Sequence, residues 1–287
     1  MTTVFSNRIS FNQLSSQGGP LYEKQGVGSS ILPLATKMFE LKKVKKARNR
    51  LEKITDFLFK LFQLNLKYKE NRNDYGIEIF EYFYLPWRAD PEFNNYYNIV
   101  GDYTLNPKSR LFTLYDYSKR YLDDNTTFIE VGCWNGGASA LVALANKNKK
   151  NDFILCDTFT GVANASNKDT FFKGNEYSDA SIENIKKLEL QTNKSFEVIS
   201  GIFPDSMKSI KIKKPISFAH IDVDTYISAK ESFYFIASNS RKGAVIILDD
   251  YGGWFTDGAT KFGNELKFDK NFFVAPNHLG QLIIFKL

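Results

Sequence analysis

The chain has 287 residues, of which 43% are hydrophobic and 15% aromatic, enough apolar surface to bury the core of one large domain. Two cysteines are too few for a disulfide framework, and no apolar run approaches the ~20 residues that cross a bilayer. Because the first residues also lack the apolar core of a secretory signal, we expect a soluble, cytoplasmic protein without a membrane span.

The positive charge is concentrated in one short segment. Residues 42–53 carry seven basic side chains and one acid, and the difference equals the formal net charge of +6. Residues 101–287, by contrast, carry 23 basic and 22 acidic side chains. The basic segment lacks the interleaved aromatic residues of a nucleic-acid site, so no nucleic-acid partner is expected. A non-enzymatic protein that binds an anionic polymer stays open as an alternative.

Residues 1–100 are interpreted as an N-terminal extension. Residues 1–30 are polar and glycine-rich, which is typical of a loop. Residues 34–70 have apolar residues three and four apart, which predicts a helix whose apolar face packs on the rest of the protein or on a second subunit. We therefore expect a homo-oligomer. Residues 77–105 are aromatic and are interpreted as irregular, with breaks at the prolines of "LPW" and "DPE".

Residues 101–287 show the alternating pattern of an α/β domain. After a predicted helix at 109–121, five short apolar runs are each followed by a polar or helical stretch: 127–132, 152–159, 196–201, 216–222 and 244–250. This alternation predicts a Rossmann-like, mostly parallel sheet with helices on both faces. The last two runs, 271–276 and 281–287, are too close together for a crossover helix, so they are predicted to form a C-terminal antiparallel hairpin.

The loop after the first predicted strand is the expected ligand site. It reads "EVGCWNGG", in which Gly132 permits a tight turn and Gly136 lets the next helix begin close to a ligand. The second strand ends at Asp157, 25 residues after Gly132, about where an acid binds the two hydroxyls of a ribose. The two features together indicate a cofactor that contains adenosine.

The same loop favours S-adenosylmethionine over a dinucleotide. Trp134 stands where a dinucleotide site has its second glycine, and its bulk hinders the approach of a pyrophosphate. Glu130 at the end of the strand repels phosphate but suits the positively charged end of S-adenosylmethionine. An NAD-dependent oxidoreductase on the same kind of sheet is the alternative.

Two later strands end in carboxylates. Asp222 ends the fourth strand, and Asp249 and Asp250 end the fifth. If the first strand is the switch point, the fourth lies beside it and the fifth next, so the three acids converge. Their mutual repulsion is relieved by a hard divalent cation such as Mg²⁺. Helix N-capping is the alternative role for each Asp, and His220 is interpreted as a hydrogen-bonded core histidine.

Five motifs in order resemble the macrocin O-methyltransferase family. They are "IEVGCWNGGAS", "DTFTGV", "GIFPDSM", "HIDVDTYISAKES" and "ILDDYGGWFTDGATK", and the resemblance covers roughly residues 100–287. It implies a class I methyltransferase domain at 101–287 that uses S-adenosylmethionine and Mg²⁺ or Mn²⁺. The implied acceptor is a hydroxyl of a sugar, carried by a nucleotide sugar, a surface glycan or a glycosylated natural product.

The resemblance also implies roles for single residues. Asp222, Asp249 and Asp250 are implied to hold the metal, and the residues implied to bind the cofactor are Glu130, Gly132, Trp134, Gly136, Asp157, Thr158, Phe159, Ile202, Phe203 and Asp222. Catechol methyltransferases of this fold have a lysine three residues beyond the first metal Asp, where this chain has Thr225. Asp224 or Asp222 is therefore left as the candidate catalytic base.

Overall fold

The computed structural model describes residues 85–147, 149–253 and 255–287. The predicted helix at 34–70, and with it the subunit contact expected from its apolar face, lies outside the described residues. Among the helices that are described, none combines the length and the apolar character needed to cross a membrane.

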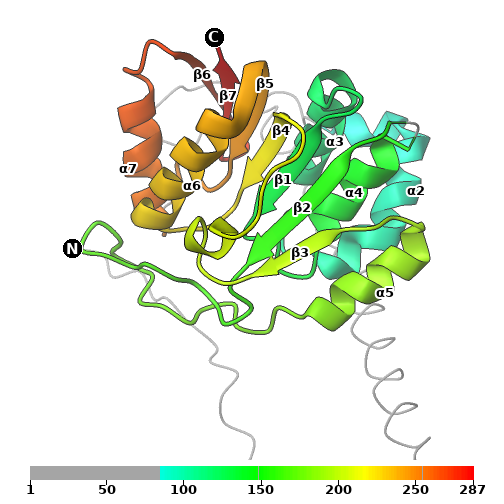
Figure 1. Cartoon of the computed structure of the whole chain (residues 1–287), viewed down its shortest axis with the longest axis horizontal. Coiled ribbons are helices and arrows are strands. Elements are labelled where there is room, and N and C mark those ends of the chain that lie inside the picture. Colours follow the sequence, from blue (N-terminus) through cyan, green and yellow to red (C-terminus); the bar gives the residue numbers. More distant parts are fainter. Residues whose placement is uncertain (1–84, 148, 254) are drawn as a thin grey trace, which may run out of the picture. The chain divides into compact units, whose positions relative to one another are not determined.

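The described residues form one seven-stranded sheet in the order β3-β2-β1-β4-β5-β7-β6 (Figure 1). Its strands are β1 (Thr127–Val131), β2 (Asp152–Asp157), β3 (Glu197–Ser200), β4 (Ile216–Ile221), β5 (Ser240–Leu248), β6 (Phe272–Asn277) and β7 (Gln281–Lys286). The first five run parallel, and β7 pairs antiparallel with both β5 and β6. The predicted parallel sheet, its switch point at β1 and the C-terminal hairpin are confirmed.

Helices cover both faces of the sheet (Figure 1). They are α2 (Pro91–Val100), α3 (Lys108–Tyr121), α4 (Gly137–Ala145), α5 (Ile182–Thr192), α6 (Tyr226–Asn239) and α7 (Asp257–Leu266), with short 3-10 helices at Pro86–Ala89, Gly101–Tyr103 and Asp205–Met207. Phe128 and Phe218 stack in the core under α2, α3 and α4. On the other face, Phe233 of α6 packs against Phe262 of α7. Nearly continuous apolar strands follow from this two-sided burial.

The strand register brings the functional loops to one edge. Val131 lies opposite Cys156 and Ile221, and Ile221 lies opposite Leu248. The segments that follow β1 and β4 remain adjacent beyond these positions, because the amide of Asp222 donates to the oxygen of Val131 over 2.8 Å. The first residues after β1, β2, β4 and β5 therefore meet at the carboxyl edge of the sheet.

The expectation that residues 77–105 are irregular is wrong for their second half. Pro91, interpreted as a break, opens helix α2, where a proline at the first helical position loses no hydrogen bond. Asp90 caps the helix by accepting a 2.8 Å hydrogen bond from the amide of Phe93. Phe93 and Val100 are fully buried in the core under α3 and α4, so residues before 101 also contribute to the core of the sheet domain.

Candidate active site

A cavity of about 350 Å³ opens at the carboxyl edge of the sheet. Its lining draws on the loops after β1, β2, β3, β4 and β5 and on the segment before α3. The predicted site residues that line it are Glu130, Gly132, Trp134, Asp157, Thr158, Ile202, Phe203, Asp222, Asp224 and Asp250. Gly136, Phe159 and Asp249 are not among the lining residues: Gly136 caps helix α4, Phe159 follows the turn at Asp157, and Asp249 lies behind the cavity wall.

Gly132 is required by the close approach of two loops. Its φ of 86° lies in the left-handed region, and a side chain there would overlap the backbone oxygen of Asp222. Its amide donates to the oxygen of Cys156 over 2.8 Å. Gly132 therefore holds the β1 loop against the ends of both neighbouring strands, which places the expected cofactor loop beside the carboxylates after β4.

Asp157 organises the loop on the cofactor side. One carboxylate oxygen accepts from the amide of Trp134 and the other from the amide of Phe159, both over 2.8 Å. Burial raises the pKa of Asp157 in spite of these two bonds. Since the two carboxylate oxygens have four lone pairs between them, capacity remains for a hydroxyl donor. The position suits the predicted role toward a ribose.

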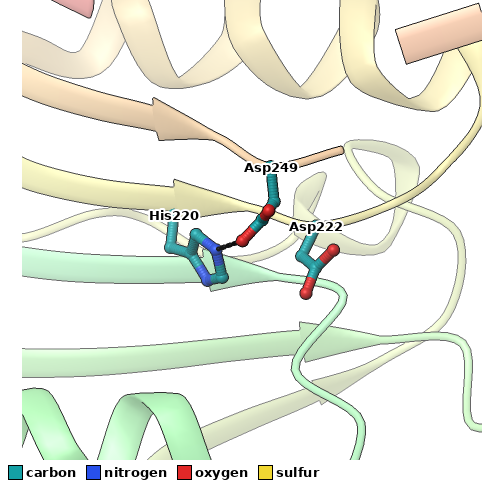
Figure 2. A group of neighbouring side chains, drawn as sticks. All are labelled: His220, Asp222 and Asp249. Atoms are coloured by element: carbon teal, nitrogen blue, oxygen red, sulfur yellow. Dashed lines mark hydrogen bonds and ion pairs between the residues drawn. The ribbon is translucent and has the colours of Figure 1, made fainter. Parts of the chain in front are cut away.

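Glu130 belongs to a buried chain of hydrogen bonds. It accepts from the hydroxyl of Ser139 in α4, and its other oxygen lies 2.7 Å from Nδ1 of His220. Nε2 of His220 in turn lies 3.0 Å from Oδ2 of Asp249, the contact drawn in Figure 2. His220 is fully buried with both ring nitrogens engaged by carboxylates. The interpretation of His220 as a hydrogen-bonded core histidine is confirmed.

Asp249 is 1% exposed and has four donors around its two oxygens. Oδ1 forms a 2.6 Å ion pair with Nη1 of Arg110 and accepts a 2.9 Å hydrogen bond from the amide of Asp250. Oδ2 faces Nε2 of His220 and accepts from Nε2 of Gln281 over 3.1 Å. A carboxylate so deeply buried is held in place by these partners from α3, β4 and β7.

The other carboxylates of the edge have fewer donors. Asp222 accepts a 2.8 Å hydrogen bond from the amide group of Asn106. Asp250 accepts from Nη1 of Arg110 over 2.9 Å. Among the described residues that line the cavity, Arg110 is the sole basic side chain. The edge therefore carries more negative charge than the chain itself compensates.

This excess charge is visible in the pKa values on the cavity side. Burial, followed by the charges of Asp250 and Asp249, raises the pKa of Asp222 well above its ordinary value. Burial and the charge of Asp250 raise the pKa of Asp224 to about 8. Burial is the larger cause of both shifts, and the charges of the neighbouring carboxylates add to it.

Asp249 behaves differently because it has donors. Burial acts to raise its pKa, but the hydrogen bond from His220 and the charge of Arg110 outweigh burial and lower the pKa. Burial acts to lower the pKa of His220, but the carboxylates of Asp249 and Glu130 raise it well above its usual range. The two residues are a charged pair stabilised from both sides.

The structure removes the alternative of helix N-capping for the three acids. The N-cap of α6 is Thr225, three residues after Asp222, and the N-cap of α7 is Thr256, beyond both Asp249 and Asp250. The amide of Tyr226 at the start of α6 donates instead to Asp169, in the loop after β2. The acids after β4 and β5 therefore have no capping role.

The arrangement offers a cation site of oxygen ligands. Suitable ligand atoms of His220, Asp222 and Asp249 all lie within 4.8 Å of one another (Figure 2). Since both nitrogens of His220 already have carboxylate partners, the ligands that line the cavity are Asp222 and Asp250, and Asp249 lies beside them with partners at both oxygens. Such a set suits a hard cation such as Mg²⁺ or Mn²⁺.

Four residues of the site were missed by the sequence reasoning. Arg110, Asn106 and Gln281 bind the carboxylates, and Tyr177 lines the cavity from the long loop after β2. Gln281 is 32 positions from its partner Asp249, and Arg110 is 140 positions from its partner Asp250. No local pattern marks such residues.

A family model described as macrocin O-methyltransferase (TylF) matches residues 100–272. The O-methyltransferase NovP is similar in structure, with 17% identity, a TM-score of 0.56 and coverage of 64% of this chain and 82% of that one. The calicheamicin methyltransferase CalS11 has 14% identity and a TM-score of 0.50, with coverage of 75% of this chain and 99% of that one. Cofactor-bound Rv0187 from MTB has 11% identity and a TM-score of 0.50, with coverage of 69% of this chain and 90% of that one. No curated protein matches the chain. At these identities the structures confirm the fold predicted from the sequence, that of class I methyltransferases.

Proposed function

Because the chain belongs to the macrocin O-methyltransferase family, it is an S-adenosylmethionine-dependent O-methyltransferase, and we propose that it methylates a sugar hydroxyl with the help of Mg²⁺ or Mn²⁺. Family membership decides against the two alternatives left open by the sequence, the NAD-dependent oxidoreductase and the non-enzymatic polymer-binding protein. The proposed metal dependence is supported by the convergence of possible ligand atoms from the ends of β4 and β5 beside the cavity.

The metal ligands in this proposal are Asp222, Asp249 and Asp250. Their fit rests on the chemistry of the donor set, since three carboxylates meet at one edge and the basic groups beside them are Arg110 and the buried His220. A bound metal would supply Lewis acidity, which lowers the pKa of an acceptor hydroxyl.

Asp224 is proposed as the base that takes the acceptor proton. It lines the cavity next to Asp250, whereas Asp222 is held by Asn106 and assigned to the metal. The pKa of about 8 that burial gives Asp224 suits a group that accepts a proton near neutral pH. Thr225 occupies the position of the catechol-type lysine, and its hydroxyl donates to the oxygen of Ala163, so it is engaged in the fold.

S-adenosylmethionine supplies the methyl group. Asp157 is proposed to accept from the ribose hydroxyls, and Gly132 and Trp134 to line the methionine end together with Glu130. Ile202, half-exposed in the cavity, and Phe203 are proposed to border the adenine. These residues fix the donor at the β1–β2 side, so that an acceptor bound over the carboxylates is placed for in-line attack.

We also propose a cytoplasmic location and a homo-oligomer. The cytoplasmic location is supported by Cys133 and Cys156, which are both free thiols buried in the core. The homo-oligomer is supported by the apolar spacing within residues 34–70 of the sequence.

The test begins with binding and continues with transfer. Calorimetry is expected to find binding of S-adenosylhomocysteine and none of NAD. Radiolabelled methyl transfer from S-adenosylmethionine is then measured on a panel of glycosides and nucleotide sugars, with Mg²⁺, with excess chelator, and after Mg²⁺ is restored. Label in a sugar that is lost in chelator and regained with Mg²⁺ supports the proposal. Failure to bind S-adenosylhomocysteine would sink it, and transfer undiminished by chelator would remove the metal.

A further inference from the structure

Both oxygens of Asp249 are closely surrounded in the described structure. Oδ1 has the amide of Asp250 and the ion-paired Nη1 of Arg110 within 2.9 Å, and Oδ2 has the side chains of His220 and Gln281 within 3.1 Å. Metal ligation by this carboxylate therefore requires that one of the four donors leave. Which donor leaves is decided by how firmly the fold holds each of them.

Three of the four donors are fixed by the sheet. The amide of Asp250 is main chain, and the ring of His220 is clamped between Asp249 and Glu130 inside the core. Gln281 begins strand β7, is fully buried, and accepts a 2.9 Å hydrogen bond from Asn277 across the hairpin turn. Moving any of them would break the sheet or leave a buried polar group unpaired.

Arg110 is the donor that can move. Its side chain is 19% exposed and lines the cavity, and it reaches the site from helix α3 along a flexible stem. Nη1 alone contacts both carboxylates, at 2.6 Å from Asp249 and 2.9 Å from Asp250. A rotation of the outer side chain would release both acids at once. In the described structure Nε of the same side chain donates a 2.8 Å hydrogen bond to the oxygen of Leu279.

We propose that Arg110 is a tethered counter-cation that holds the metal site closed until a divalent ion displaces its guanidinium from Asp249 and Asp250. This inference rests on the proposed metal ligands, and it adds that Arg110 lowers the affinity of these ligands for the metal. The guanidinium and the ion compete for the same oxygens, so the affinity of the site is set in part by the strength of the arginine pair. Mutually exclusive binding of this kind is a negative coupling between the two cations.

The test compares the affinity for Mn²⁺ alone as the probe, read from the electron paramagnetic resonance of free Mn²⁺ at saturating S-adenosylhomocysteine. Arg110→Gln is expected to bind Mn²⁺ about tenfold more tightly than the wild type, within the 5- to 150-fold range of ordinary couplings. Arg120→Gln is the matched control: it removes the same charge from the same helix, but Arg120 is exposed and pairs with Asp116. Its Mn²⁺ affinity is expected to equal that of the wild type.

The outcomes separate this inference from the proposed function. Equal or weaker Mn²⁺ binding by Arg110→Gln, with binding by the wild type, would show that the arginine organises the ligands rather than blocking them, and would overturn the inference alone. No Mn²⁺ binding by either protein would overturn the metal site and the inference together, while retained binding of S-adenosylhomocysteine would leave the methyltransferase assignment intact.

A measurement on the wild type covers the case in which Arg110→Gln does not fold. The Nε–H signal of Arg110 in a ¹⁵N-labelled protein is expected to shift when Mg²⁺ is added, because the guanidinium changes partners. The signal of Arg120 serves as the internal reference and is expected to stay in place. An unchanged Arg110 signal at saturating Mg²⁺ would contradict displacement.

Discussion

The two halves of the carboxyl edge hold their acids in different ways. After β2, Asp157 is bound by main-chain amides from two loops, at 2.8 Å each. After β4 and β5, the acids are held mainly by side chains, above all by Arg110, which forms ion pairs with both Asp249 and Asp250. The half after β2 is thus preorganised by the backbone, whereas the half after β4 and β5, which is proposed to bind the metal, keeps negative charge that a bound cation would compensate.

The largest effect is expected from a change that breaks the contact between the halves. Gly132→Ala puts a methyl group onto the backbone oxygen of Asp222 at a φ of 86°, so the β1 loop must move away from β4. We expect a loss of at least ~2 kcal/mol in unfolding free energy and loss of S-adenosylhomocysteine binding. Gly252→Ala is the matched control, since Gly252 has a φ of 85° but open space around it. Equal losses in both variants would show that backbone strain, and not the loop contact, is responsible.

A smaller effect is expected within the half after β2. Asp157→Ala removes the proposed acceptor for a ribose and the observed acceptor for two loop amides, and should weaken S-adenosylhomocysteine binding by at least ~1.5 kcal/mol, roughly tenfold, in calorimetry. Asp152→Asn is the control, because Asp152 begins the same strand at the opposite edge of the sheet and pairs with Lys214. Undiminished affinity in Asp157→Ala would contradict its assignment to the cofactor.

The smallest effect on stability is expected for Glu92, an acid outside the carboxyl edge of the sheet whose side chain accepts several hydrogen bonds. Hydrogen bonds from Lys119 and then Tyr115 lower the pKa of Glu92 to about 2. A depressed pKa stabilises the fold above the ordinary value of 4.5, and this contribution is lost as the pH falls toward 2. Because the Glu92 side chain is 40% exposed, solvent screening keeps its contribution below about 1 kcal/mol.

Glu92→Gln should therefore lower the urea midpoint slightly at pH 7, and the difference from the wild type should shrink between pH 4.5 and 2. Asp116→Asn, which removes an exposed pair with Arg120 on α3, is the comparison. A difference between Glu92→Gln and the wild type that is constant down to pH 2 would show that the charge of Glu92 contributes nothing to stability.

The sequence predicted the features that are written in local patterns. Five apolar runs separated by helical stretches predict the parallel sheet, and the spacing from Gly132 to Asp157 indicates the cofactor loops. Convergence of Asp222 and Asp249 followed from the rule that parallel strands end at one edge. Pro91 was misread because a proline marks a helix start as well as a break, and the choice depends on the cap at Asp90.

The sequence did not predict the donors that hold the acids. Arg110 and Asp250 are 140 positions apart, and Gln281 reaches Asp249 only because the hairpin inserts β7 beside β5. Such pairs are products of tertiary packing, which single-residue patterns do not encode. For the same reason the N-capping alternative could not be settled from the sequence, since it required knowing that α6 begins after Thr225 and α7 after Thr256.

The acids after β4 and β5 are proposed to bind a divalent cation, and the variant Asp249→Asn provides the sharpest test of this proposal. The variant keeps the shape of the side chain and removes one charge from a set whose charge determines its hold on a hard cation. In Mn²⁺ titrations followed by electron paramagnetic resonance, we expect the wild type to bind Mn²⁺ and Asp249→Asn to bind it at least about tenfold more weakly. Both proteins should bind S-adenosylhomocysteine equally well. Asp205→Asn, at an exposed acid after β3, is expected to match the wild type. Equal Mn²⁺ affinity in Asp249→Asn and the wild type would contradict the claim.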